Sequence, residues 1–101
     1  MRLLRRIAEA RFEPPERQIE IFDADGGFIG RIDLGWRHRH AGLEYDSDLH
    51  HNPRVWARDE LRHHRYLAAG WDVRRVRKYD LLPSATRLDD LLARFWQGRA
   101  A

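Results

Sequence analysis

The chain has 101 residues, of which 43% are hydrophobic and 35% charged. We therefore expect one globular domain, residues 1–101, with one modest core. It has a net charge of +3 and no cysteine, which excludes disulfides, thiolate nucleophiles and cysteine-based zinc sites. No apolar run approaches the roughly 18 to 20 residues of a membrane span, and the basic start lacks the apolar segment of a secretory signal. A cytoplasmic protein with no membrane partner is the expectation.

The positive charge is almost entirely arginine. Of the 19 basic residues, all are Arg except Lys78. Guanidinium groups bind phosphate in a bidentate manner, so this bias fits a nucleic-acid partner without requiring one. GC-rich codon usage would produce the same bias, and the two explanations stand side by side.

The first half of the chain predicts a helix followed by three strands. Apolar residues recur at helical spacing over residues 2–11, and Pro14 and Pro15 end that pattern. The next segments have the alternating polarity of strands and are separated by turns over 23–27 and 37–40. These predicted strands are 17–22, 28–36 and 41–46.

The second half predicts a helix, a strand and a helix. Asn52 can cap the first of these helices, Pro53 suits its first turn, and Gly70 suits its end. A fourth strand over 71–79 and a helix over 83–98 follow. The order α-β-β-β-α-β-α predicts an α/β (α+β) fold with a small mixed four-stranded sheet, in which the crossover helix makes the last two strands parallel.

Three carboxylates are expected on one patch of this sheet. Side chains alternate along a strand, so Glu44 and Asp46 point to one side, opposite to Leu43 and Tyr45. In a hairpin that turns near residues 37–40, the numbers of two paired residues add up to about 77. Asp33 is therefore expected opposite Glu44.

Such a cluster favours a divalent cation. Neighbouring carboxylates repel one another unless a cation neutralises them, and hard oxygen ligands suit Mg²⁺ or Mn²⁺. The predicted metal ligands are Asp33, Glu44 and Asp46. The metal would lower the pKa of a bound water, and His50 could act as general base or position that water.

Other interpretations remain open. Carboxylates at strand ends are often solvated, and residues 46–48 could form a turn and a helix cap. Six histidines lie between positions 38 and 64, yet the adjacent His63 and His64 lack a zinc-ligand geometry. A charged stripe on the central helix is predicted to contact nucleic acid through Arg58, Arg62 and Arg65. Within it, Asp59 and Arg62 are expected to form a surface ion pair.

The segments "GRIDLGW" and "LEYDSDLHHNPRVWARDELRHHRYLAAGWDVRRVRKYDLL" resemble endonuclease-like domains of unknown function related to the very-short-patch-repair endonuclease. These domains belong to the PD-(D/E)XK restriction-endonuclease-like superfamily. The likeness covers residues 28–82, within an expected core of about 17–82. The matching positions are Asp33, Glu44, Asp46, His50, Arg58, Asp59, Arg62, Gly70, Trp71, Val73, Arg75 and Val76.

The resemblance implies a restriction-endonuclease-like fold and a Mg²⁺- or Mn²⁺-dependent DNA endonuclease, acting in repair, mobile-element or defence functions. It makes Asp33 and Glu44 metal ligands and His50 the general base. Asp46 stands where the superfamily has a lysine, as a further ligand or a water-positioning group. Ser47 replaces a glycine of the pattern, which would strain the loop if a positive φ is needed there.

Relatives often carry an N-terminal winged-helix domain, so this chain would be a minimal form or a piece of a longer one. The competing hypothesis is a non-catalytic nucleic-acid-binding module on a nuclease scaffold. A third is a protein-interaction domain, such as a homodimer formed through exposed tryptophans.

Overall fold

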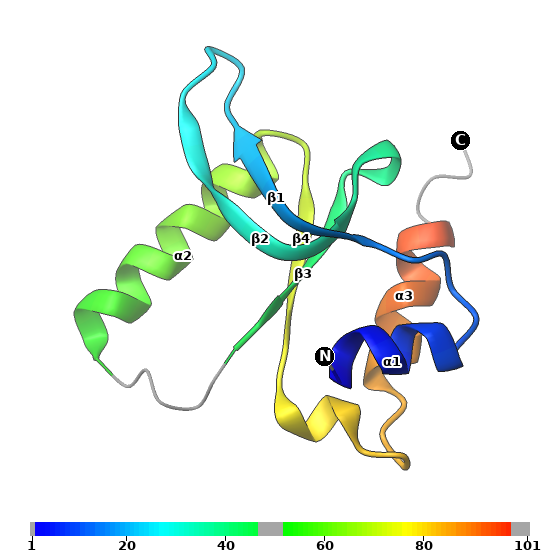
Figure 1. Ribbon diagram of the computed structural model, residues 1–101. Coiled ribbons are helices and arrows are strands. Elements are labelled where there is room, and N and C mark those ends of the chain that lie inside the picture. Colours follow the sequence, from blue (N-terminus) through cyan, green and yellow to red (C-terminus); the bar gives the residue numbers. More distant parts are fainter. Residues whose placement is uncertain (1, 47–51, 98–101) are drawn as a thin grey trace.

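The computed structural model describes residues 2–46 and 52–97 (Figure 1). Three helices and a four-stranded mixed sheet are present, as predicted. In chain order the elements are α1 (Arg2–Glu9), β1 (Glu16–Phe22), β2 (Phe28–Trp36), β3 (Ala41–Tyr45), α2 (Pro53–Ala68), β4 (Asp72–Val76) and α3 (Arg87–Gln97). Two short 3₁₀ helices, η1 (Arg37–Arg39) and η2 (Lys78–Leu81), follow β2 and β4. None of the described helices is long and apolar enough to cross a membrane.

The strands lie in the order β1-β2-β3-β4. The first three form an antiparallel meander, and β4 pairs with β3 in parallel after the chain has passed through α2. Leu34 pairs with Leu43, and Trp36 pairs with Ala41. This is the register that the hairpin turn predicts, because each pair sums to 77.

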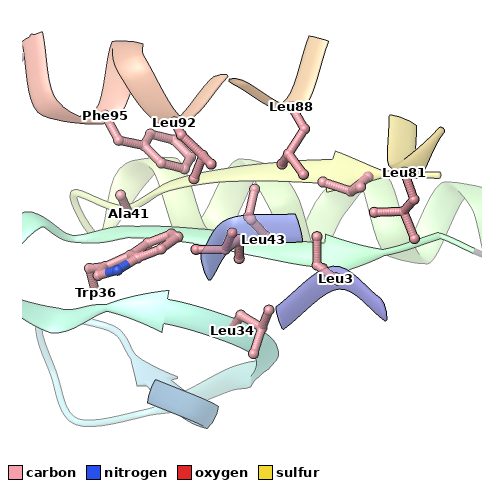
Figure 2. Packing of buried hydrophobic residues seen from close by; sticks show 11 residues of the cluster. Leu3, Leu34, Trp36, Ala41, Leu43, Leu81, Leu88, Leu92 and Phe95 are labelled. Atoms are coloured by element: carbon pink, nitrogen blue, oxygen red, sulfur yellow. The ribbon is translucent and has the colours of Figure 1, made fainter. Parts of the chain in front are cut away.

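Helices cover both faces of the sheet, with α1 and α3 on one side and α2 on the other (Figure 1). The expectation of one core was wrong, because the sheet separates two apolar clusters. The larger cluster lies under α1 and α3, where Trp36 and Leu43 meet leucines of both helices (Figure 2). It consists of Leu3, Ile7, Leu34, Trp36, Ala41, Leu43, Val76, Leu81, Leu88, Leu92 and Phe95.

The smaller cluster lies under α2. Its buried members are Ile19, Ile21, Ile29, Ile32 and Tyr66, of which only Tyr66 comes from the helix. The helix also exposes Trp56, Leu61 and Leu67 to solvent. The smaller cluster is therefore built mainly from the β1–β2 hairpin.

The side chains of β2 switch from one face of the sheet to the other at Asp33. Ile32 and Leu34 are two residues apart and would share a face on a regular strand, yet Ile32 packs in the smaller cluster and Leu34 in the larger. On β1 the paired residues are Arg17 and Ile19, and Gln18 between them has a left-handed φ of 57°. Gln18 and Asp33 lie between the same two residue pairs of β1 and β2, so the irregularity involves both strands. Asp33 is the residue at which the side chains of β2 switch faces.

Three of the predicted elements are longer than those in the structure. Helix α1 ends at Glu9 rather than at residue 11, because Arg11 has a φ of 62°. Strand β4 ends at Val76 rather than at residue 79, and α3 begins at Arg87 rather than at residue 83. The predicted N-cap is confirmed, since the Asn52 side chain accepts a hydrogen bond of 2.9 Å from the Arg54 N–H.

Candidate functional site

The three predicted carboxylates line one hollow of about 310 Å³. Its lining residues come from β2, β3, α2 and β4 and from Asp46 directly after β3. The pairing of these two strands ends at Leu34 and Leu43, one residue short of Asp33 and Glu44. The lining residues are Arg31, Asp33, Glu44, Tyr45, Asp46, Val55, Asp59, Arg62 and Arg75.

Asp33 is tied to the neighbouring strand through its side chain. Its Oδ2 accepts a hydrogen bond of 2.8 Å from the backbone N–H of Tyr45. A carboxylate thus takes the place of a backbone carbonyl just beyond the end of the β2–β3 ladder. The contact fixes the orientation of Asp33 while using one of its two oxygens.

Glu44 points toward α2 and is held by three of its side chains. The glutamate side chain is only 13% exposed and that of His63 16%. The His63 Nε2 lies 2.9 Å from Glu44 Oε2, and an Arg62 guanidinium nitrogen lies 3.7 Å from the same oxygen. The Tyr66 hydroxyl donates to Oε1 over 3.5 Å. Burying a carboxylate without such partners is costly, so these three contacts offset the burial of Glu44.

Tyr66 is fully buried beside this carboxylate. Burial raises the pKa of Tyr66 to about 12, and the negative charge of Glu44 adds to this effect, while Arg62 opposes it. The phenol therefore stays protonated near neutral pH and remains a hydrogen-bond donor to Glu44. Gly30 makes this packing possible, since a Cβ there would overlap the Tyr66 hydroxyl and the Cδ of Arg62.

Asp46 approaches the hollow from the β4 side. Its backbone N–H donates to the Val76 carbonyl over 2.8 Å, which extends the β3–β4 pairing. Its carboxylate lies 3.6 Å from the Arg77 Nε, and both side chains are substantially exposed. This ion pair is long and solvated, so it constrains the Asp46 carboxylate much less than α2 constrains Glu44.

The donor chemistry of the hollow fits a hard cation such as Mg²⁺, which binds one or two carboxylates and keeps water or phosphate oxygens as its other ligands. Over residues 2–46 and 52–97, no group of three His, Cys, Asp or Glu side chains is arranged to hold a metal ion.

Two of the sequence-based assignments cannot be placed. His50, the predicted general base, and Ser47, which replaces the glycine of the family pattern, both lie outside the described residues.

The predicted arginine stripe on α2 is partly engaged within the protein. Arg62 contacts Asp59 over 3.2 Å, which confirms the predicted ion pair, and also approaches Glu44. Arg65 lies 3.5 Å from Asp23 of the β1–β2 turn. Arg58 is exposed. The stripe therefore offers solvent less positive charge than a count of its arginines implies.

The contacts of His63 and Tyr66 with Glu44 are not predicted from the sequence, which suggests for His63 only a zinc ligand beside His64. The structure turns the two histidines in different directions, His63 toward Glu44 and His64 into solvent. The i, i+3 spacing of His63 and Tyr66 was the available signal, because it places both on one helix face.

No protein-family model, curated protein or solved structure matches this chain.

Proposed function

We propose that this protein is a Mg²⁺- or Mn²⁺-dependent endonuclease that hydrolyses phosphodiester bonds in DNA. The observation that carries the proposal is the convergence of Asp33 and Glu44, from neighbouring strands, on one hollow at the end of the β2–β3 pairing. The order of elements, with β4 parallel to β3 after the crossover helix, is the order expected of a restriction-endonuclease-like domain and supports the proposal.

Asp33 and Glu44 would hold the cation, which would supply a water of lowered pKa and stabilise negative charge on the phosphate. The Tyr45 N–H orients Asp33, and His63 and Tyr66 orient Glu44. Such partners of metal-binding side chains fix their direction and affect metal affinity.

Asp46 is proposed as a further ligand or as the group that positions the attacking water. Its carboxylate lines the same hollow and is only loosely paired with Arg77.

His50 is proposed as the general base. Arg58, Arg62 and Arg65 would contact the DNA backbone, which fixes the position of a duplex without reading its sequence. A cytoplasmic location and a role in repair, mobile-element or defence functions belong to the same proposal.

The second candidate is a non-catalytic nucleic-acid-binding module. It is favoured by the contacts of Glu44, whose two oxygens already interact with His63, Arg62 and Tyr66. A carboxylate held in this way can be a structural anchor for α2, with no metal to bind.

A cleavage assay separates the two candidates. The purified protein, Asp33→Asn and Glu44→Gln are incubated with supercoiled and single-stranded DNA in the presence of Mg²⁺ or Mn²⁺. Glu20→Gln, on an exposed position of β1, is the matched control because it removes one negative charge elsewhere.

We expect the wild type and the control to cleave DNA, EDTA to abolish cleavage, and both site variants to fall to background. Cleavage that survives in both site variants would contradict the proposed site. DNA retention without cleavage by all four proteins would favour the binding module.

A further inference from the structure

A second and larger hollow, of about 600 Å³, lies along the β4 edge of the sheet. Four arginines line it, three from β4 and the residue after it and one from α3: Arg74, Arg75, Arg77 and Arg87. The only carboxylates among its lining residues are Glu60 and Asp80. The hollow therefore has an excess of positive charge.

The internal ion pairs of these arginines leave donors for a ligand. Arg87 donates to Asp80 over 2.8 Å and to the Arg75 carbonyl over 3.2 Å, both through Nη1. Arg74 makes two hydrogen bonds with Asp72, which does not line this hollow. The Arg77 side chain is 60% exposed, and its one ion pair among the described residues is the long contact of 3.6 Å with Asp46. Each guanidinium carries five N–H donors, so one or two hydrogen bonds use a minority of them.

Arg75 supplies the most specific signal. Its Nη1 donates to Glu60, whereas its Nη2 is buried and has no hydrogen-bond partner among residues 2–46 and 52–97. An unsatisfied buried donor on a charged group is costly. Arg75 also lines the carboxylate hollow, so the two hollows adjoin at this side chain.

A simpler explanation covers part of the pattern. Charged side chains on an edge strand prevent another strand from pairing with it, which accounts for arginines on β4. It does not account for the concave shape, for the arrival of Arg87 from α3, or for the buried Nη2 of Arg75. Tyr79, whose ring is exposed, also lines the hollow, and basic grooves with an exposed aromatic ring are typical of single-stranded nucleic-acid binding.

We infer that this arginine hollow binds phosphate groups of a nucleic-acid strand, and that the same strand continues past Arg75 to the carboxylate hollow. The inference rests on the proposed function, since it assigns the path of that substrate. Tyr79 would stack on a base of the bound strand.

The test is a binding measurement without cleavage. A fluorescein-labelled oligothymidylate of about 12 nucleotides is titrated in EDTA at several salt concentrations, and binding is followed by anisotropy. The double variant Arg74→Gln/Arg77→Gln is compared with Arg17→Gln/Arg94→Gln. Arg17 and Arg94 are exposed and lie outside the hollow, so both variants lose the same charge.

We expect the hollow variant to weaken binding more than about 10-fold and the control less than about threefold. For a single strand, each lost phosphate contact reduces the slope of log K against log salt concentration by about 0.7 in magnitude. Two lost contacts should therefore reduce it by about 1.4. Tyr79→Ala should weaken binding by about fivefold or more. Equal weakening by the two double variants would overturn the inference, because it would reduce the effect to net charge.

A competition experiment distinguishes binding of a nucleic-acid strand from binding of a small phosphate ligand. Displacement of the oligonucleotide by thymidine monophosphate at similar concentrations would overturn the assignment to a strand. If the double hollow variant melts early, the single variants Arg74→Gln and Arg77→Gln replace it, with about half the change in salt slope expected from each. Hollow-dependent binding without any cleavage would overturn the proposed function alone, and cleavage without hollow-dependent binding would overturn this inference alone.

Discussion

Replacing Tyr66 by phenylalanine removes the buried hydroxyl that approaches Glu44 and should change how stability depends on pH. Burial, aided by the Glu44 charge, raises the pKa of Tyr66 from its ordinary value of 10.0 to about 12. The unfolded chain loses this proton near pH 10, whereas the folded protein keeps it until about pH 12. Tyr66 therefore contributes fully to stability below pH 10, and the contribution is lost as the pH rises toward 12.

The magnitude follows from the two pKa values. One pKa unit corresponds to about 1.4 kcal/mol. The free energy of unfolding should therefore fall, through Tyr66 alone, by about 1.4 kcal/mol at pH 11 and by about 2.3 kcal/mol at pH 12. Tyr66→Phe cannot ionise, so this part of the alkaline loss should vanish in the variant.

Urea unfolding from pH 8 to pH 12, followed by circular dichroism, measures the difference. Tyr79→Phe is the matched control, because the Tyr79 ring is exposed, and it should retain the full alkaline loss of the wild type. If the stability curves of the wild type and Tyr66→Phe run parallel over the whole range, the burial of Tyr66 against Glu44 is refuted.

Three further predictions concern the packing and one ion pair of the folded protein. Gly30→Ala would overlap the Tyr66 hydroxyl, so it should lower the free energy of unfolding by about 1–3 kcal/mol and lower the titration midpoint of Tyr66 in ultraviolet absorbance. Leu43→Ala empties a fully buried position of the larger cluster and should destabilise by about 2–5 kcal/mol in urea unfolding. The hydrogen bond from Arg75 lowers the pKa of Glu60, so that pair stabilises the protein above the ordinary value near 4.5. The stability difference between wild type and Glu60→Gln should then disappear as the pH falls below that value.

The sheet was predictable because its signals are local. Alternating polarity marks the strands, and the short turn between β2 and β3 leaves little freedom for their register, which places Leu34 against Leu43. The same register predicts that Asp33 and Glu44 approach one another, and both do line one hollow.

The contacts of the site depend on interactions that are distant in sequence. The change of face at Asp33 coincides with the left-handed backbone of Gln18 on another strand. The role of His63 depends on how α2 lies over the sheet, since its partner Glu44 is 19 residues away. The alternation of polar and apolar residues along one strand cannot predict contacts of this kind.

The end of β4 likewise depends on a distant side chain. Asp80 accepts the backbone N–H of Arg77 over 2.9 Å and a hydrogen bond from Arg87 on the neighbouring helix. These contacts stabilise the 3₁₀ turn η2, where the sequence pattern favours continued strand.

Binding of Mn²⁺, measured by the loss of the free-ion electron paramagnetic resonance signal, tests the central claim most directly. The wild type is compared with Asp33→Asn, Glu44→Gln and the control Glu20→Gln. We predict that the wild type and the control bind the ion and that each site variant loses at least about 10-fold in affinity. Equal affinity in all four proteins, or no binding by the wild type, would contradict a divalent-cation site formed by Asp33 and Glu44.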